Sequence, residues 1–416
     1  MLHRVRLDLA YDGSHFSGWA LQPGLRTVQG VLEDALSKVL RTPERTTVTV
    51  AGRTDVGVHA SAQVAHADLS EEQWIRLSGG RRAGEGTLPQ EAVLERRLRG
   101  ILGQYSDLSV HRVSRAPEGF DARFSARWRR YEYRLADASS LRHPLERAYT
   151  TWITESVDED GMNRAAQSLL GLHDYASFCR ARVGATTIRT LLDFDWERDS
   201  DGVLHAHLRA DAFCHSMVRA LVGACVAVGH GRLAAEDVAG LRDDAARTNA
   251  FAVMPARGLI LREVDYPEDS SLAERAVQTR VRRTLPVAET LDCAQVLPVE
   301  TIESVLDLPE GFATPSEEVG VCAWSMAGNP TALLLQSAAG ATLADATAQQ
   351  ASAVGAVGSD LGEAAFFQPG DPAQDPASTF TVLAGDRLVS LRSSVGAQDA
   401  LETLAEDVLA ALGEAE

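Results

Sequence analysis

The sequence predicts an α+β protein with two similar halves, each made of antiparallel strands with helices packed on one side, followed by a small acidic α+β domain. Three observations lead to this prediction. Apolar and polar residues alternate from Val5 to Tyr11, as in a strand with one buried face. Apolar residues recur with helical spacing over 28–40, and a similar order of elements returns after residue 155. With 416 residues, the chain is long enough for several folded domains.

The first half, residues 1–135, continues after the helix at 28–40 with two strands on either side of a glycine-bounded loop at 52–60. A helix and a strand follow, and a further strand passes through a segment rich in arginine and aromatic residues. The elements expected here are strands at 46–50, 62–69 and 107–116, a helix at 91–102 and a strand within 120–137.

The second half, residues 136–267, is expected to repeat this order. Its most apolar segment, 213–229, reads as a long buried helix, and the chain then returns to a last strand. The other elements expected in this half are a helix at 158–171 and strands at 187–197, 203–211 and 258–266.

The remaining chain differs in composition. The stretch from Pro267 to residue 290 is polar and holds two prolines, which predicts a linker over 268–290 with one or two helical turns. Residues 291–416 are predicted to form a separate acidic domain that ends in a helix at 397–412. The whole net charge of −18 lies within 284–416, which contain two basic and 20 acidic side chains, so this segment should be repelled by nucleic acid.

The five cysteines form no CxxC pair and lack neighbouring histidines at zinc-ligand spacing, so no metal site is expected. We expect five reduced thiols, although Cys293 and Cys322 faintly resemble cysteines that pair in small domains of actinobacterial secreted lipoproteins. No segment approaches the roughly 18 consecutive apolar residues of a membrane span. The opening residues carry charges where a signal peptide is apolar, which predicts a cytoplasmic protein without membrane attachment.

The segment GRTDVGVHA at 52–60 is the strongest candidate for chemistry. A carboxylate between glycines in an inter-strand loop can be exposed at the end of a sheet. Arg53 is close enough in sequence to reach Asp55 and hold the carboxylate ionised, as a nucleophile or base requires. Spacing alone favours the alternative, in which Asp55 caps its own turn and Arg53 is merely solvated.

Seven motifs together resemble the TruA family of tRNA pseudouridine synthases over about residues 5–267. They occur in the family's order, and some positions depart from its pattern, including Val56, Cys214 and Ser216. The motifs are YDGSHFSGW at 11–19, RTVQGVLEDAL at 26–36, GRTDVGVHA with QVAH at 52–66, FDARFSARWRRYEYR at 120–134, GLHDYASF at 171–178, FCHSMVRALVG at 213–223 and GLILREVDYP at 258–267.

The resemblance implies the pseudouridine synthase fold and a cofactor-free isomerisation of uridine to pseudouridine in the anticodon stem-loop of tRNA, at nucleotides 38–40. Asp55 would attack the ribose or take a proton from it in a glycal route, and Arg53 would pair with Asp55 and help to extrude the base. Tyr131 would stack on the base and transfer a proton, Arg219 would face the pocket, and Leu259 would line its floor. Each of these three residues has a structural alternative. Tyr131 would be an ordinary core tyrosine, Arg219 a buried helix arginine paired with a carboxylate, and Leu259 a core leucine.

Arginines interleaved with aromatic residues between 120 and 134 fit phosphate contact together with base stacking. The alternative is a solvated strand edge with ion pairs. The resemblance also implies a homodimer with tRNA as partner, whereas the acidic domain is expected to bind an unknown protein. A protein that binds RNA without catalysis is the rival function. The arginines expected to bind substrate are Arg123, Arg127, Arg129 and Arg130.

Overall fold

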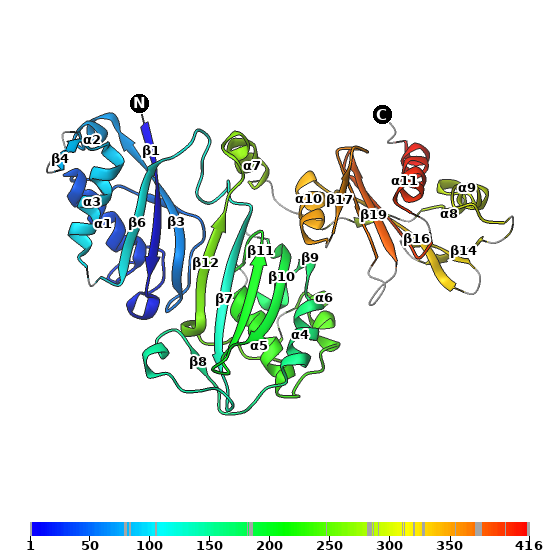
Figure 1. The fold of residues 1–416 in the computed structure, drawn as a ribbon, viewed down its shortest axis with the longest axis horizontal. Helices are drawn as coiled ribbons and strands as arrows, with labels where there is room; N and C mark the ends of the chain where they lie inside the picture. Colours follow the sequence, from blue (N-terminus) through cyan, green and yellow to red (C-terminus); the bar gives the residue numbers. More distant parts are fainter. Residues whose placement is uncertain are drawn as a thin grey trace. The chain divides into compact units, whose positions relative to one another are not determined.

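The chain folds into two compact units, Met1–Arg282 and Arg283–Glu416 (Figure 1). The structure is a computed structural model. It describes residues 2–78, 81–82, 85–104, 106–180, 182, 186–246, 248–280, 285, 287–289, 291–309, 311, 313–318, 321–326, 329–353, 355–370, 377–395 and 397–413.

Unit 1 is built on a ten-stranded sheet in the order β6-β1-β3-β12-β7-β11-β10-β9, with β2 paired to β3 and β8 to β7 (Figure 1). The strands are β1 (Leu2–Tyr11), β2 (Val48–Val50), β3 (His59–Ser70), β6 (Leu108–Arg115), β7 (Trp128–Ala136), β8 (Thr151–Trp152), β9 (Gly171–Asp174), β10 (Ile188–Arg198), β11 (Leu204–Ala210) and β12 (Leu259–Asp265). A separate hairpin joins β4 (Arg81–Arg82) to β5 (Glu85–Thr87).

The sheet is mixed, which corrects the prediction of purely antiparallel sheets. Most neighbours are antiparallel, but β12 runs parallel to β3, and β8 runs parallel to β7. Because β12 also pairs with β7, it joins the strands of the first half to those of the second. The two expected halves therefore share one sheet.

One face of this sheet is apolar. Alternate residues of β1 and of β11 are buried, whereas the residues between them are partly exposed. The buried residues belong to one core cluster that includes Leu7 from the first half and Leu221 from the second. The helices of unit 1 are α1 (Val28–Leu40), α2 (Glu71–Ile75), α3 (Gln90–Leu102), α4 (Glu159–Gln167), α5 (Met217–Gly229), α6 (Asp237–Asp243) and α7 (Leu272–Gln278), with 3₁₀ turns η1 (Gly13–His15), η2 (Pro144–Glu146), η3 (Ala176–Phe178), η4 (Ala256–Gly258) and η5 (Asp269–Ser271).

The opposite face of the sheet is polar and carries ion pairs. On β7 the carboxylate of Glu132 meets His205 Nδ1 at 3.1 Å and Arg262 Nε at 2.8 Å. The other ring nitrogen of His205 lies 3.0 Å from Asp199. Although burial opposes it, hydrogen bonds from His205 and Arg262 lower the pKa of Glu132 to about 2. The hydrogen bond to Glu132 in turn raises the pKa of His205.

Part of the expected linker 268–290 packs on unit 1. Helix α7 buries Leu272 and Ala276, and the hydroxyl of Ser125 donates to the Leu272 carbonyl at 3.0 Å. Further along, β13 (Val287–Ala288) pairs with a strand of unit 2. Residues 281–284, 286 and 290 of the expected linker lie outside the described part of the chain.

Unit 2 is an antiparallel sheet in the order β14-β15-β16-β20-β19-β18-β17, with β13 paired to β16. The expected terminal helix is present as α11, which packs on β19 and β20 through Leu401, Leu404 and Val408. The elements are α8 (Cys293–Val296), α9 (Val299–Val305), β14 (Ala313–Glu318), β15 (Val321–Met326), β16 (Asn329–Ala339), α10 (Leu343–Ser352), β17 (Val357–Ser359), β18 (Ala364–Gln368), β19 (Ser378–Ala384), β20 (Arg387–Ser393) and α11 (Gln398–Leu412).

The cysteines differ from the expectation of five reduced thiols. Cys179 is bonded to Cys214 and Cys293 to Cys322, with Cα–Cα distances of 5.8 and 5.5 Å. Cys225 is free and buried, and burial raises the pKa of its thiol to about 12. Within the described ranges, no helix has both the length and the apolar character that a membrane crossing needs.

Candidate active site

Asp55 lies in the loop between β2 and β3, and the loop between β1 and α1 holds the residues next to Asp55 in place. The Trp19 amide donates to the Thr54 carbonyl at 3.0 Å, and the Tyr11 and Thr54 hydroxyls are 2.8 Å apart. Gly18 adopts φ +85° here, and a Cβ at this position would lie 3.0 Å from the Thr54 carbonyl oxygen. Glycine therefore permits the close approach that shapes the loop around Asp55.

The Asp55 carboxylate faces side chains from the second half of unit 1. Its Oδ2 accepts from the Ser216 hydroxyl at 3.1 Å and from Arg219 Nη1 at 3.4 Å, and His215 Nε2 lies 3.4 Å from Oδ1. All three partners come from the start of α5 and the residues just before it. The loop of one half and the helix of the other therefore meet at this carboxylate.

The predicted pairing of Arg53 with Asp55 is not observed. Arg53 is exposed, and within the described residues its guanidinium forms no ion pair with the Asp55 carboxylate. Arg219 occupies that place instead. Its Nε donates to the Met254 carbonyl at 2.6 Å, which fixes the guanidinium next to Asp55.

Asp55 opens onto a pocket that also includes Tyr131, Arg219 and Leu259, which the sequence singled out separately. Tyr131 lies on β7 opposite Leu261 of β12, and its ring packs edge-on against Phe213 with centroids 5.1 Å apart. The pocket is lined by Thr54, Asp55, Val58, Tyr131, Phe213, Cys214, Ser216, Met217, Val218, Arg219 and Leu259.

The Tyr131 hydroxyl is held in its protonated form. Burial raises the pKa of this hydroxyl above its ordinary range, and the nearby Tyr11 and Asp55 act in the same direction. A buried aromatic ring with a protonated hydroxyl, beside a carboxylate, can stack on a planar base and exchange a proton with it.

A positively charged group lies near the Asp55 loop. The Arg123 side chain is exposed, yet desolvation lowers the pKa of its guanidinium, and the positive charges of Arg53 and Arg182 lower it further. The Arg123 guanidinium also lies 4.7 Å from the ring centroid of Phe124. Clustered guanidinium groups of this kind favour a polyanion such as the RNA backbone.

Two of the four arginines expected to bind substrate lie elsewhere. Arg129 is 6% exposed and donates to the carbonyls of Asp211, Ala51 and Arg123, so it is a structural residue that phosphate cannot reach. Arg130 follows it on β7 and therefore lies on the opposite face of the sheet from Tyr131, where it pairs with Glu263 at 2.8 Å. This corrects the prediction for both residues.

Arg127 is exposed and forms an ion pair with Asp265 at 2.5 Å. The structure brings together Asp55, Tyr131, Arg219 and Leu259, and it places Arg53 beside Arg123. The described residues contain no cluster of three or more histidine, cysteine, aspartate and glutamate side chains that could hold a metal ion.

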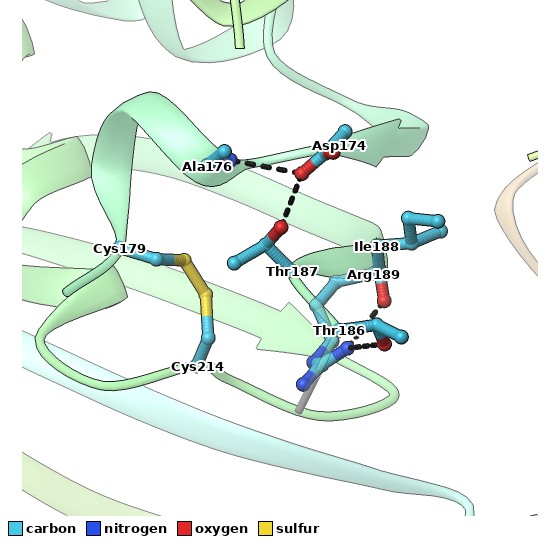
Figure 2. Close-up of a disulfide and its surroundings, with 8 residues drawn as sticks. All are labelled: Asp174, Ala176, Cys179, Thr186, Thr187, Ile188, Arg189 and Cys214. Carbon is cyan, nitrogen blue, oxygen red and sulfur yellow. Dashed lines mark hydrogen bonds between the residues drawn. A yellow bond between two sulfur atoms is a disulfide. The ribbon is translucent and has the colours of Figure 1, made fainter. Parts of the chain in front are cut away.

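A disulfide anchors the loop that leads into α5. Figure 2 shows Cys179, just after η3, bonded to Cys214, two residues before Ser216. The start of η3 is fixed by Asp174, whose Oδ1 accepts from the Ala176 amide and from the Thr187 hydroxyl (Figure 2). The Arg180 amide adds a hydrogen bond to the His215 carbonyl at 3.0 Å.

The sequence prediction missed Phe213, His215 and Ser216 as residues of the site. All three flank Arg219 in the motif FCHSMVRALVG, which was expected to face the pocket. Ser216 and Cys214 were noted only as departures from the family pattern. Their position just before a helix that carries a pocket arginine was the available signal.

Comparisons with known proteins find close relatives. A family model described as tRNA pseudouridine synthase matches residues 165–267. The tRNA pseudouridine synthase A of Leifsonia xyli subsp. xyli is 59% identical over 283 residues, which cover 68% of this chain and 98% of the relative. The proteins of the same name from Streptomyces griseus and Mycobacterium leprae are 49% and 47% identical, each over 68% of this chain and over 95% and 96% of their own lengths.

Proposed function

Because this chain belongs to the tRNA pseudouridine synthase A family, we propose that unit 1 isomerises uridine to pseudouridine in tRNA, with Asp55 as the essential carboxylate. The observation that carries this proposal is the pocket in which Asp55, Tyr131 and Arg219 meet. The substrate nucleotides are those of the anticodon stem-loop, positions 38–40, and no cofactor takes part.

The reaction breaks the bond between the ribose C1′ and N1 of the base, turns the base and forms a bond between C1′ and C5. The proton on C5 is then lost, and N1 gains one, so the product is an isomer of the substrate. Asp55 either attacks C1′ or removes a ribose proton. Both routes require a charged carboxylate, and Arg219 supplies a fixed positive charge beside it.

The flipped base stacks on Tyr131, and the protonated hydroxyl of that residue relays a proton at C5. Leu259, which is 5% exposed, forms part of the apolar lining. Arg53 and Arg123 bind phosphates next to the pocket, and Arg53 helps to hold the base outside the stem. Arg127, which remains exposed, contributes to the same RNA surface.

A pair of matched variants tests the role of Asp55. Asp55→Asn keeps the size of the side chain and removes its charge, and we expect no detectable pseudouridine with unchanged tRNA affinity. Asp34→Asn makes the same change at an exposed carboxylate paired with Arg45, and it should leave the rate unchanged. Chemical mapping of pseudouridine in tRNA from a deletion strain complemented with each variant gives the readout.

Full activity of Asp55→Asn would show that another carboxylate is essential. Unchanged anticodon-arm pseudouridine in the deletion strain would refute the substrate assignment. Binding of tRNA by the wild-type protein without product would instead support the rival function, an RNA-binding protein that lacks catalysis.

We further propose a homodimer that acts on tRNA in the cytoplasm. Unit 2 is proposed to bind a protein partner, because its 20 acidic side chains within 284–416 oppose contact with RNA. Light scattering coupled to size-exclusion chromatography measures the oligomeric state, and elution as a monomer at working concentration would refute the dimer.

A further inference from the structure

We propose that Ser216 is a positioning residue for this reaction: its hydroxyl fixes the Asp55 carboxylate in the pocket through the hydrogen bond to Oδ2. The inference rests on the proposed function, since it concerns how the carboxylate of that reaction is oriented. From the sequence, Ser216 stands out only as a departure from the family pattern, with no role of its own.

The conformation of Ser216 is unusual for its position. It is the residue before α5, with φ 64° and ψ 8°, in the left-handed region. A serine at the start of a helix ordinarily has an extended backbone, and its hydroxyl accepts a hydrogen bond from an amide in the first turn. At Ser216 the side chain makes no such capping bond. The hydroxyl points instead to Asp55.

This arrangement costs stability, because a residue with a Cβ is disfavoured in the left-handed region and an uncapped helix start leaves amides without a partner. Neighbouring contacts keep the residue there. The Met217 amide donates to the Cys214 carbonyl at 3.1 Å, and the Arg180 amide donates to the His215 carbonyl at 3.0 Å. The bond between Cys214 and Cys179 anchors the same loop (Figure 2).

Among the described side chains around Asp55, the Ser216 hydroxyl is the nearest donor to Oδ2. Arg219 Nη1 reaches the same oxygen at 3.4 Å, but its guanidinium is already held by the Met254 carbonyl at 2.6 Å. His215 lies 3.4 Å from Oδ1, and its side chain is 40% exposed. Arg219 thus supplies charge at a longer distance, whereas Ser216 supplies the directed hydrogen bond that sets the orientation of the carboxylate.

Three variants of the full chain separate the hydroxyl from the backbone strain. Ser216→Ala removes the hydroxyl and keeps the Cβ. Ser216→Gly removes the hydroxyl and also relieves the left-handed backbone. Ser216→Asn retains a donor, and asparagine tolerates this conformation. The assay is release of tritium from unmodified tRNA carrying [5-³H]uridine, because the hydrogen on C5 leaves when the new bond forms.

We expect Ser216→Ala and Ser216→Gly to lower the single-turnover rate at saturating tRNA by about 10- to 100-fold, as loss of a hydrogen bond to a charged group implies. The tRNA dissociation constant should change by less than about twofold, since the hydroxyl acts on the chemical step. Ser216→Asn should retain most of the rate. A purely structural serine would alter folding or tRNA affinity and would not be rescued by Asn.

Wild-type rates in both Ser216→Ala and Ser216→Gly would overturn the inference, as would recovery of the rate by Gly but not by Asn, since that pattern assigns the effect to backbone strain. Asp55→Asn is measured in parallel. If it is inactive while Ser216→Ala is unaffected, the proposed function stands and only the role of Ser216 fails. If Asp55→Asn retains the rate, the assignment of Asp55 fails and the inference with it.

Discussion

Replacement of Arg129 by methionine should destabilise unit 1 far more than the neutralisation of its neighbour Arg130. Arg129 Nη1 donates to the Asp211 carbonyl at 2.6 Å, and its Nη2 donates to the carbonyls of Ala51 and Arg123 at 2.9 and 2.6 Å. These carbonyls lie in three separate loops. One of them precedes Asp55, and another precedes the segment that contains Ser216.

The magnitude follows from the groups left behind. Each buried carbonyl that loses its donor costs about 1–3 kcal/mol, which gives about 2–6 kcal/mol for the carbonyls of Asp211 and Ala51, and the part-buried Arg123 carbonyl costs less because water can reach it. Removal of the buried guanidinium offsets part of this loss, because burial lowers the pKa of Arg129 and its charged form is therefore costly. We expect a net loss of about 3 kcal/mol in the free energy of unfolding, a large share of the 5–15 kcal/mol typical of a domain.

Urea denaturation of the full chain, followed by tryptophan fluorescence, measures this change. Arg130→Gln is the control, because it breaks an ion pair whose side chains are 46% and 43% exposed and should cost less than about 1 kcal/mol. Pseudouridylation should also fall in Arg129→Met at temperatures where the protein stays folded, since two loops of the site lose their anchor. Equal midpoints for the two variants would refute the structural role assigned to Arg129.

Three further predictions concern stability and the extent of the catalytic unit. Reduction of the Cys293–Cys322 bond, which closes a loop of 29 residues, should lower the stability of unit 2 by about 3–4 kcal/mol in urea denaturation. The raised pKa of His205 predicts a contribution to stability that is complete below about pH 6.5 and is lost as the pH rises through the pKa of His205 in the folded protein. Glu132, with a pKa of about 2, predicts a loss of stability as the pH falls from about 4.5 to 2. Urea denaturation at a series of pH values across this range measures both effects. A chain ending at residue 282 should keep its rate of pseudouridine formation. Because it lacks residues 284–416, which carry the net charge of −18, it should also bind tRNA at least as tightly in low salt. A chain ending at 267 should be less stable than the chain ending at 282, because it lacks α7.

Each of these predictions has an outcome that contradicts it. An unchanged midpoint on reduction, with a Cys179→Ser/Cys214→Ser variant to isolate the second bond, would show that the bridge in unit 2 adds no stability. A His205→Gln protein with the same pH dependence as the wild type would remove His205 as the cause. Equal stability of the chains ending at 267 and 282 would show that α7 adds nothing to the core.

The local elements were predictable from the sequence because their signals are local. The apolar spacing at 28–40 predicted the helix that the structure shows as Val28–Leu40, and the alternation from Val5 to Tyr11 predicted β1. The parallel pairing of β3 with β12 could not be predicted in this way, because it joins residues about 200 positions apart and no local periodicity records it.

The same difference between local and distant signals applies to the residues of the site. Asp55 was found from its own loop, but its partner Arg219 lies 164 residues away, whereas Arg53, two residues away, does not pair with it. Sequence proximity in a loop does not fix the direction of a side chain. The arginines were a different case: alternation along β7 already implied that Arg129 and Arg130 lie on opposite faces, so the sequence held a signal that was not used.

The place of β12 in the sheet has a consequence for synthesis of the chain on the ribosome. β12 is the last strand of unit 1 to be translated, yet it lies between β3 and β7. Until residues 259–265 have emerged, β3 keeps an open edge toward β12, and the nascent first half exposes unpaired backbone groups there. Unit 1 therefore completes its sheet only after β12 has emerged, and until then the open strand edge is a site at which nascent chains can associate edge to edge.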